Sequence, residues 1–330
     1  MTDRFDLRTG QQEKMTDKPQ LGMSTGTIDG SVCAVIVSYF PDLARLDALL
    51  ESVRSQVGMV VIVDNGSSDD ALTGIRRLAH RAAVRLIEFD ENRGIAVAHN
   101  AGIRHAMESR FEYVLLLDHD SRLLPDCVPQ LLQASRRLSH AGITVAAVGP
   151  QYNDETSARR APFWRFYRWS YRRIFARPED ETIETSVLIS SGMLVSCNML
   201  QAIGLMDETL FIDGVDWEWC FRASALGYRL FGVTAAIMQH SLGDSGVKVF
   251  GRILPLHSPL RHYYVYRNMV LMCRMTKIPM SWKFYFSLRL TVRFLIYIAL
   301  APHRRERCRM IWQGMRDGFS GRSGRIGLNI

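Results

Sequence analysis

Short apolar runs alternate with amphipathic stretches from residue 31 onward, and this alternation restricts the chain to few folds. A short continuous apolar run predicts a strand buried on both faces, and apolar residues at helical spacing predict the helices that cover it. The pattern therefore predicts an α/β fold with a mostly parallel central sheet flanked by helices. Strands are expected at residues 32–37, 59–63, 84–89, 113–117, 145–148, 188–195 and near 229–238, and helices at 43–57, 71–82, 95–109 and 215–226.

Length and composition agree with this fold and exclude other classes. The 330 residues allow one large domain with additions or two smaller domains. A hydrophobic content of 47% is enough for a substantial core, which excludes disorder as the main state. Gly and Pro are scattered without a repeat, which excludes a collagen-like chain or a repeat array. Residues 1–30 show no apolar periodicity and are predicted to be a disordered leader.

The formal net charge of +8 favours an anionic partner. Nucleic acid, anionic lipid and phosphorylated small molecules all meet this condition. The segment 158–181 is rich in Arg and aromatic residues and is expected at the surface, where its rings would suit base stacking. No recognised RNA or DNA module accompanies it, so we predict no nucleic-acid partner. Nucleic-acid binding stays a rival that steep salt dependence would reveal.

The last third of the chain is basic, and residues 282–301 are strongly apolar but interrupted by Lys283, Arg289 and Arg293. A spanning helix needs about 20 predominantly apolar residues, and an Arg near its centre is costly. We therefore predict an amphipathic helix that lies on an anionic membrane surface, within a membrane-associating extension at 276–330. A helix docked on the protein core is the alternative, and the sequence does not separate the two.

The cysteines and the N-terminus predict a cellular compartment. Six cysteines lie far apart without a CxxC pair, which argues against a disulfide framework or a structural zinc site and favours a reducing compartment. No apolar run follows a basic start, so no secretory signal is expected. The predicted location is the cytoplasm, on the inner face of the membrane.

Polar turns follow the first four predicted strands, at residues 38–41, 64–66, 90–94 and 118–120. In an open α/β sheet, ligands bind beyond the carboxyl ends of the strands, so these turns are expected along one edge. Each turn alone has a structural explanation as a tight turn or a helix cap. Asp118 and Asp120 are harder to explain in that way, because two carboxylates at a sheet edge need a cation or donors. The pair suits Mg²⁺ or Mn²⁺ bound together with a diphosphate.

Two further acids and a histidine are candidates for chemistry. Asp213 and Asp216 gather at the N-terminus of the predicted helix 215–226, where either capping or a general-base role would explain them. His240 follows the last apolar strand. A lone histidine is usually structural, but beside Asp120 it becomes a candidate third metal ligand.

The motifs, in their order and spacing, resemble the family 2 glycosyltransferases of GT-A fold, and more narrowly the bacterial rhamnosyltransferases. The resemblance covers about residues 31–275, and only the ordered set of motifs is specific. The segments that carry it are VIVSY at 35–39, VDNGSSD at 63–69, NRGIAVAHN at 92–100, LLLDHDS at 115–121, LISSG at 188–192, FIDGVDWEWCFRA at 211–223 and HSPLRHYYVYRN at 257–268.

The resemblance implies a role for each matching residue. It implies Asp216 as the catalytic base and Asp118 and Asp120 as the metal motif, with Asp120 the more direct ligand and His240 completing the shell. Many members carry Glu directly before the base, where this chain has Val215. Asp213 lies two positions earlier, which leaves open whether it shares the base role or binds sugar. The residues implied in nucleotide-sugar binding are Tyr39, Asp64, Asn92, Gly94, Asn100, Asp118, Arg267 and Asn268.

Within that set, Asp64 is implied at the pyrimidine base, and Arg267 with Asn268 near the diphosphate and the acceptor. The resemblance implies an inverting, metal-dependent transfer of L-rhamnose from dTDP-L-rhamnose to a lipid-linked saccharide of O-antigen or lipopolysaccharide assembly. A rhamnolipid second-step transferase is the leading variant. A sugar-nucleotide-binding protein without turnover is a further alternative.

Overall fold

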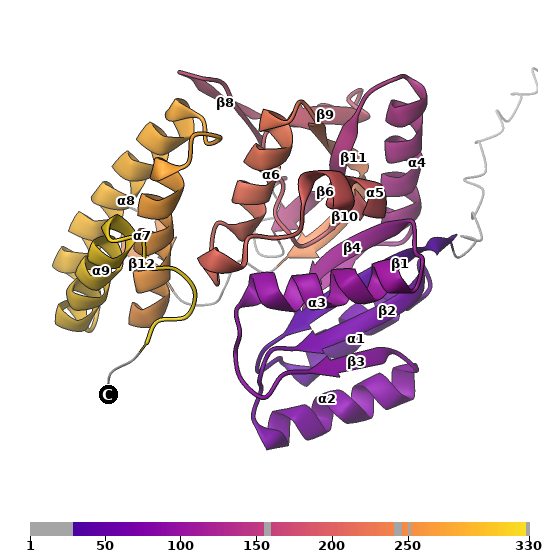
Figure 1. Ribbon diagram of the computed structural model, residues 1–330, viewed down its shortest axis with the longest axis horizontal. Coiled ribbons are helices and arrows are strands. Elements are labelled where there is room, and N and C mark those ends of the chain that lie inside the picture. Colours follow the sequence, from indigo (N-terminus) through magenta and orange to yellow (C-terminus); the bar gives the residue numbers. More distant parts are fainter. Residues whose placement is uncertain (1–28, 155–159, 241–245, 250–251, 328–330) are drawn as a thin grey trace, which may run out of the picture.

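The computed structural model describes residues 29–154, 160–240, 246–249 and 252–327. A nine-stranded sheet forms its centre, in the order β3-β2-β1-β4-β10-β6-β11-β5, with β9 pairing β11 (Figure 1). The β1–β2, β1–β4, β2–β3 and β6–β11 pairs are parallel, whereas β10 runs antiparallel to both of its neighbours. The predicted α/β fold with a mostly parallel central sheet is confirmed.

The strands of the main sheet are β1 (Asp29–Ser38), β2 (Val57–Asp64), β3 (Arg85–Glu88), β4 (Tyr113–Asp118), β5 (Ser121–Leu123), β6 (Val145–Asp154), β9 (Thr182–Thr185), β10 (Met193–Ser196) and β11 (Arg229–His240). Two hairpins lie outside it, formed by β7 (Phe163–Phe166) with β8 (Tyr171–Ile174) and by β12 (Gly246–Val249) with β13 (Arg252–Pro255). The helices are α1 (Leu43–Arg54), α2 (Asp69–Ala82), α3 (Ile95–Glu108), α4 (Cys127–His140), α5 (Cys197–Ile203), η1 (Glu208–Leu210), α6 (Val215–Ala225), α7 (Pro259–Arg274), α8 (Met280–Leu300) and α9 (Arg304–Phe319).

The sheet is buried on both faces because side chains of each strand alternate between two cores. In β1, Cys33, Val35 and Val37 pack with α3, α5 and α6. The intervening side chains of β1 pack with α1, α2 and α4 on the other face. This double burial is why the central strands read as continuous apolar runs in the sequence.

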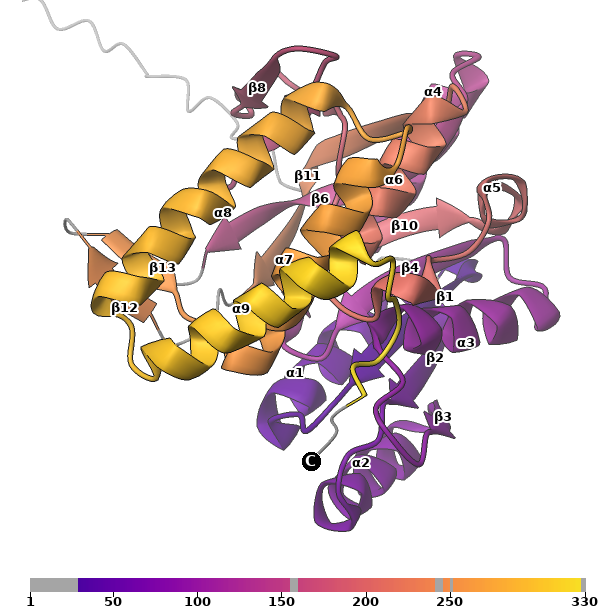
Figure 2. The ribbon, with the colours of Figure 1, turned by 60° about the vertical axis from the view of Figure 1, so that its left-hand side comes forward.

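Helices α7, α8 and α9 form a separate layer beside the sheet, on the side of α6 (Figures 1 and 2). Two glycines of α9 let it approach α7 closely. A Cβ at Gly314 would lie 2.3 Å from the carbonyl oxygen of Tyr263, and a Cβ at Gly318 would lie 2.8 Å from that of Arg267. Side chains at these positions would therefore push the two helices apart.

Several segments differ from the sequence-based prediction, and helices α5 and α7 were not predicted. Residues 188–192 form a turn rather than the start of a strand, because Gly192 has φ +83° and β10 begins only at Met193. Helix α4 was not predicted, although it covers one face of the sheet. The segment 158–181 contains the β7–β8 hairpin, which packs on the molecule through Phe163 and Phe166. Of the predicted leader 1–30, residues 1–28 lie outside the described residues.

Candidate active site

Three carboxylates meet at the carboxyl edge of the sheet. Asp118 ends β4, Asp216 stands in the first turn of α6, and Asp213 precedes that helix. Asp216 keeps some exposure to solvent but is densely surrounded by protein. Burial, with the negative charges of Asp118 and Asp213, raises the pKa of Asp216 to about 7. A carboxylate with a pKa near neutrality can take up and release a proton at physiological pH.

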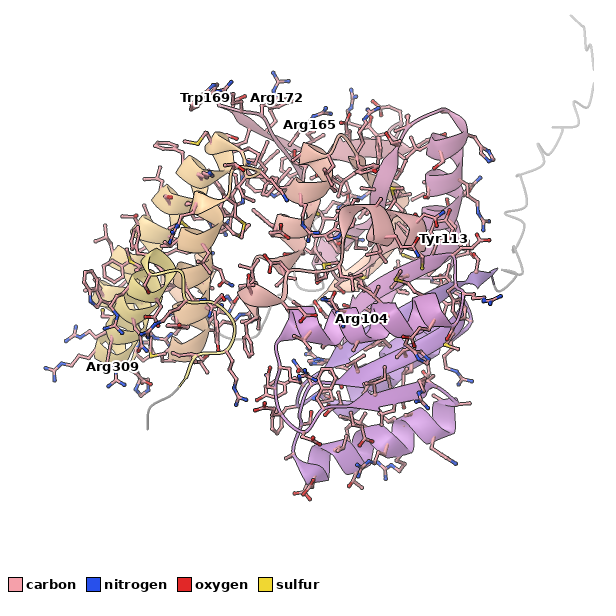
Figure 3. All side chains as sticks on the ribbon, in the orientation of Figure 1. Arg104, Tyr113, Arg165, Trp169, Arg172 and Arg309 are labelled. Carbon is pink, nitrogen blue, oxygen red and sulfur yellow. The ribbon has the colours of Figure 1, made fainter. Side chains whose placement is uncertain are left out.

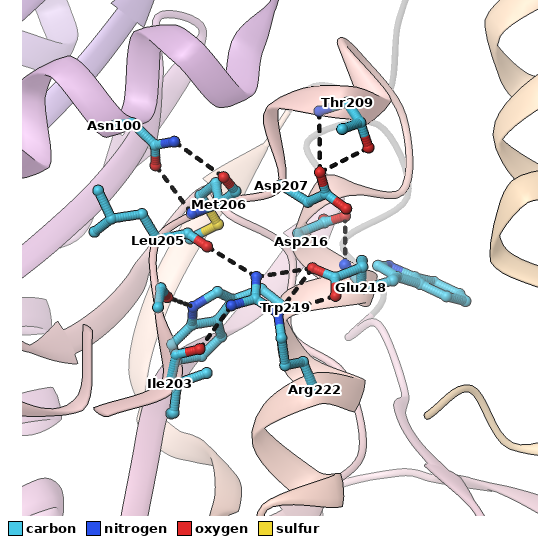
Figure 4. Close-up of polar contacts among 12 residues, drawn as sticks. Asn100, Ile203, Leu205, Met206, Asp207, Thr209, Asp216, Glu218, Trp219 and Arg222 are labelled. Atoms are coloured by element: carbon cyan, nitrogen blue, oxygen red, sulfur yellow. Dashed lines mark hydrogen bonds and ion pairs between the residues drawn. The ribbon is translucent and has the colours of Figure 1, made fainter. Parts of the chain in front are cut away.

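Backbone groups hold the Asp216 carboxylate in place. It accepts a hydrogen bond of 2.9 Å from the backbone N–H of Trp217 (Figure 4) and another from the backbone of Ser190. Helix α6 is itself fixed. The buried ion pair of Arg222 with Glu218 measures 2.9 Å, and Arg222 also donates to the carbonyls of Ile203 and Leu205. The base candidate thus stands on a rigid helix.

Asp213 is paired with a cation that the sequence analysis did not identify. The Arg261 guanidinium, in the first turn of α7, binds both carboxylate oxygens of Asp213 at 2.9 to 3.3 Å. The negative charge of Asp118 also acts on Arg261. Ser258 caps α7 and Pro259 follows it, a helix-start signal that would have placed Arg261 in the first turn. Arg261 is therefore the cation that faces the carboxylates.

Arg267 and Asn268 lie elsewhere, buried beneath the loop that carries Asp213. The Asn268 amide nitrogen donates to the carbonyls of Leu210, Ile212 and Asp213 at 2.7, 2.6 and 2.8 Å. Arg267 has no exposed surface, and its guanidinium donates to Asn268 at 3.0 Å, to the carbonyl of Leu210 at 2.9 Å and to that of Gly324. This geometry does not agree with the predicted contact of the pair with a diphosphate.

The same loop has an unusual backbone. Phe211 and Asp213 both have φ +63°, in the left-handed region that side chains disfavour, and Gly214 follows at +88°. Such conformations persist where surrounding contacts over-determine them. Here the amide of Asn268 and the guanidinium of Arg267 supply those contacts, so the pair positions Asp213.

Asp118 and Asp120 flank a turn between β4 and β5, and both are partly exposed. The backbone N–H of Asp118 donates to the Ser191 hydroxyl at 3.2 Å, and the Tyr152 hydroxyl donates to the Ser191 carbonyl at 2.8 Å. Burial and the charges of Asp216 and Asp118 raise the pKa of Tyr152 well above its usual range. Tyr152 is thus a part of the site that the sequence analysis did not name, and the Ser190–Ser191 turn belongs to the segment 188–192 that it named without assigning a role.

The two carboxylates of this turn suit a divalent cation. In the described part of the chain, no three His, Cys, Asp or Glu side chains gather closely enough to hold a metal ion by themselves. Mg²⁺ and Mn²⁺ need no such cage, because one or two carboxylates with substrate phosphates hold them. The backbone of His240 pairs with Ser121, next to this turn, but its side chain lies outside the described residues.

The predicted nucleotide residues line the ends of β1, β2 and β3. Asp64 is fully buried and accepts from the hydroxyls of Ser38 and Ser67 at 3.1 and 2.7 Å. Tyr39 is 44% exposed beside this group. Asn65 accepts from the backbone N–H of Arg93 at 2.9 Å, which joins the turns after β2 and β3.

The other residues predicted to bind the nucleotide sugar shape the start of α3. Asn92 accepts from the backbone N–H of Gly94 at 3.0 Å. Gly94 has φ +91°, and a Cβ there would lie 2.7 Å from the Phe211 ring, so only glycine fits. The Asn100 amide donates to the Met206 carbonyl at 2.9 Å (Figure 4) and to the Glu208 carboxylate at 2.8 Å. Asn100 thus joins α3 to the segment before α6, at a place away from the carboxylates of Asp118, Asp213 and Asp216.

Comparison with known proteins places this geometry in a family context. Residues 33–204 match Glycosyl transferase family 2. The chain is 35% identical over 274 residues to the dTDP-rhamnosyl transferase RfbF of Shigella flexneri, which covers 83% of this chain and 88% of the relative. It is 25% identical over 310 residues to an N-acetylglucosaminyl-diphospho-decaprenol L-rhamnosyltransferase of Mycobacterium tuberculosis, covering 85% and 97%.

Solved structures support the fold. The mannosyltransferase PcManGT of Pyrobaculum calidifontis, in complex with GDP-Man and Mn²⁺, matches with a TM-score of 0.51 and 16% identity over 89% of this chain and 75% of that one. GalNAc-T7 with UDP, GalNAc and Mn²⁺ matches with a TM-score of 0.51 and 17% identity over 72% of this chain, which spans 48% of that protein. Both matches agree with the expected GT-A fold.

Proposed function

Because this chain belongs to glycosyltransferase family 2 and is therefore a glycosyltransferase, we propose that it transfers L-rhamnose from dTDP-L-rhamnose to a hydroxyl of a lipid-linked saccharide. The observation that carries the proposal is the meeting of Asp118, Asp213 and Asp216 with Arg261 at the carboxyl edge of the sheet. The choice of rhamnose and of dTDP rests on the similarity to the Shigella flexneri enzyme. Assembly of O-antigen or lipopolysaccharide is the proposed setting.

Each part of the site has a task in this reaction. Asp216 removes the proton of the acceptor hydroxyl as that oxygen attacks the anomeric carbon from the face opposite the leaving group, which inverts the configuration. Asp118 and Asp120 would hold Mg²⁺ or Mn²⁺, which supplies positive charge to the departing diphosphate. Arg261 adds a fixed cation beside these carboxylates, and its charge is shared with Asp213.

The proposed pKa of the base predicts a pH dependence. Only the ionised Asp216 can accept a proton, and the pKa of this carboxyl is raised to about 7. We expect kcat/KM to increase as the pH rises from 5 to about 8, with its midpoint near 7. Rates measured across this range, with donor and acceptor held constant, check the assignment. A rate that is already maximal at pH 5 would contradict it.

We also propose that the protein works at an anionic membrane surface, as the inner leaflet would provide. Helix α8 presents a stripe of exposed apolar side chains, among which Phe284, Leu288 and Leu295 are 73%, 54% and 60% exposed. None of the helices in the described ranges is long and apolar enough to cross a bilayer. Arg304, Arg305 and Arg309 of α9 are exposed nearby, and Arg309 points away from the molecule (Figure 3). An apolar stripe beside arginines fits an anionic bilayer.

The β7–β8 hairpin adds to this surface. Trp169 at its tip is 72% exposed, and Arg172 projects beside it (Figure 3). The hairpin contacts α8 directly, since the Ser281 backbone N–H donates to the carbonyl of Arg168 at 3.0 Å. Aromatic and cationic side chains of this kind are suited to the interface between headgroups and acyl chains.

The donor is tested by incubating the protein with UDP-, GDP- and dTDP-sugars in the presence of Mg²⁺ or Mn²⁺, while nucleotide release and thermal shift are followed. A selective, metal-dependent response to dTDP-rhamnose supports the proposal. A response to another nucleotide sugar would contradict the rhamnose assignment but not the transferase. A thermal shift without nucleotide release would favour a binding protein without turnover, and no response to any of these sugars would contradict the proposal.

A further inference from the structure

A group of cationic side chains lies behind Arg261, contributed by three helices. It consists of Arg261 of α7, Arg293 of α8, Arg307 of α9, and the two histidines His257 and His262, and we call it the cationic cluster. The Arg307 guanidinium lies 3.3 Å from Nδ1 of His262, and the rings of His257 and His262 are 6.3 Å apart. Burial, together with Arg307, His257, Arg293 and Arg261, lowers the pKa of His262 to about 4.

Two of the three arginines of this cluster, Arg293 and Arg307, have no acid partner among the described residues, whereas Arg261 is paired with Asp213. Arg307 is 5% exposed, and its guanidinium donates only to backbone carbonyls, of Pro302 at 2.9 Å and of His257, besides facing His262. Within the described residues, no carboxylate forms an ion pair with Arg307 or with Arg293. The negative charge of Asp213 acts on His257, but the Asp213 carboxylate is already bound by Arg261. Buried cations without a counter-charge are costly, and an anion would offset that cost.

Arg293 occupies the inner side of α8. It lies on the same face as Leu290 and Tyr297, which are both buried, whereas the exposed stripe of α8 is on the other side. Burial lowers the pKa of the Arg293 guanidinium, followed by the charge of Arg289. A surface arginine whose task is to hold lipid headgroups would face outward, as Arg309 does in Figure 3.

His262 carries an unused donor inside the cluster. Its Nε2 is buried and has no hydrogen-bond partner among the residues that the structure describes, while its ring stacks on Tyr297 with centroids 4.6 Å apart. Nδ1 faces the guanidinium of Arg307, which can only donate, so Nδ1 accepts and Nε2 carries the hydrogen. Nε2 lies on the ring edge away from Arg307. A buried N–H needs an acceptor, and an anion would supply one.

The location of the cluster indicates which anion. It adjoins the carboxylate site through Arg261, and it shares α8 with the exposed apolar stripe. The donor nucleotide is expected elsewhere, at the ends of β1, β2 and β3. We propose that the cationic cluster binds the diphosphate of a saccharide acceptor linked to a lipid through that diphosphate. This inference rests on the proposed function, and it excludes glycolipid acceptors without phosphate.

Binding is tested on the full-length protein with geranyl diphosphate, geraniol and dTDP as probes. The test variant is Arg293→Gln, and the matched control is Arg77→Gln, which removes an exposed charge from α2. Wild type and the control should bind geranyl diphosphate but not geraniol. Arg293→Gln should bind it about 10-fold or more weakly, as expected for the loss of a charge-assisted hydrogen bond. Arg293→Lys keeps the charge and should restore part of the affinity, which excludes misfolding as the cause.

Turnover gives a second, independent measurement. One saccharide is supplied on a lipid diphosphate or on an uncharged alkyl chain. Arg293→Gln should raise KM about 10-fold or more for the diphosphate form only, with dTDP affinity unchanged. Equal increases for both acceptors would overturn the inference.

Other outcomes would also overturn it. Loss of dTDP affinity in Arg293→Gln would assign the cluster to the donor diphosphate. Loss of binding to phosphatidylglycerol vesicles without loss of geranyl diphosphate would assign it to lipid headgroups. If wild type binds dTDP but not geranyl diphosphate, the cluster inference fails while the proposed function stands. Binding of geranyl diphosphate with no response to any nucleotide would instead contradict the proposed function.

Discussion

Asp216 stands where an ionised carboxylate is unfavourable. Its pKa is raised from 3.8 to about 7 by burial and by the charges of Asp118 and Asp213. The backbone groups of Trp217 and Ser190 offset this only in part. An acid whose pKa is higher in the folded than in the unfolded state lowers the free energy of unfolding as the pH rises. For Asp216 this loss falls between the unfolded pKa of 3.8 and the folded pKa of about 7. The base candidate is therefore useful for proton transfer and unfavourable for folding.

Replacement of Asp216 by Asn should separate these two effects. We expect kcat to fall by about 100-fold or more, because the general base is lost, with dTDP affinity retained. The variant should also be more stable than wild type at pH 8, where wild-type Asp216 is ionised, and this advantage should vanish near pH 4. Each kcal/mol gained corresponds to roughly 2–4 °C in Tm for a chain of this size. Turnover, dTDP titration and thermal melts at both pH values measure all three.

Asp70→Asn is the matched control, since Asp70 is an exposed acid in the first turn of another helix, α2. It should leave turnover unchanged and should not raise Tm. Normal turnover in Asp216→Asn would move the base to Asp213 or elsewhere.

The metal assignment depends on Asp120. Asp120→Ala should abolish the part of dTDP binding that depends on Mg²⁺ or Mn²⁺, because a hard cation loses a carboxylate ligand. Isothermal titration of dTDP with metal and with a chelator gives this difference directly. Asp126→Ala, which changes an acid beyond β5, serves for comparison and should keep the metal effect. Unchanged metal dependence in Asp120→Ala would remove the assignment.

Helix α8 combines an inward face that packs and an outward face that has no protein partner in the described part of the chain. Trp282, Leu290 and Tyr297 are 2 to 3% exposed, whereas Phe284 and Leu288 are 73% and 54% exposed. Phe284 and Leu288 are about one helical turn apart, so these exposed residues lie in one stripe along the helix. Because one face of α8 is exposed, α8 differs from a helix buried in a core. Because Lys283, Arg289 and Arg293 interrupt its apolar residues, it also differs from a membrane-spanning helix.

A charge introduced into this stripe should weaken membrane binding without unfolding the protein. Leu288→Asp is expected to reduce binding to phosphatidylglycerol vesicles about 10-fold or more, since both apolar burial and charge attraction are lost. Leu226→Asp is the control, because Leu226 at the end of α6 is also 54% exposed. Vesicle sedimentation at low and high salt measures the effect. Equal losses in the two variants would contradict a membrane-binding role of α8.

The sequence predicts well the elements whose pattern of apolar residues has one structural cause. Strands β1, β2 and β4 are buried on both faces, so their apolar runs are unambiguous. One strand was predicted over residues 188–195, but residues 188–192, which include two serines and a glycine, form a turn in which Gly192 adopts φ +83°. Helix α4 begins at Cys127 and was missed although Asp126, directly before it, is of a residue type common at helix N-caps; in the structure Asp126 has φ +62° and makes no side-chain cap.

The candidate site could be predicted at its carboxylates but not at its arginines. Asp118 directly follows a predicted apolar strand and therefore must lie at the sheet edge, and Asp216 was found at the N-terminus of a predicted helix. Arg261 and Arg267 lie six residues apart on one helix, and that spacing places them on different faces of α7. The sequence does not show which face meets the site, and only the packing of α7 against α9 decides it.

The chain end joins the parts of the molecule that the reaction needs. The backbone N–H of Gly324 donates to the Thr209 carbonyl at 2.7 Å, and that of Ile326 donates to the Tyr264 hydroxyl at 3.0 Å. Arg325 pairs with Glu91 in the turn after β3, and Arg267 donates to the Gly324 carbonyl. Figure 2 shows this yellow segment leaving α9 and crossing toward the strands that are expected to hold the nucleotide.

Removal of residues 323–330 should therefore affect both stability and catalysis. Ile326 is 8% exposed and packs with Phe211, Tyr263 and Tyr264. Loss of its burial is worth about 1.5–3 kcal/mol, or roughly 3–12 °C in Tm. Because the buried guanidinium of Arg267 also loses its acceptor on Gly324, the loop that presents Asp213 should loosen, and kcat should fall with Tm.

A chain that lacks only residues 328–330 is the control and should match wild type in both measurements. If the shorter chain loses stability but keeps full turnover, the segment only supports the helices. Loss of turnover at a temperature well below its Tm would show that the far end of the chain holds the catalytic loop in its working conformation.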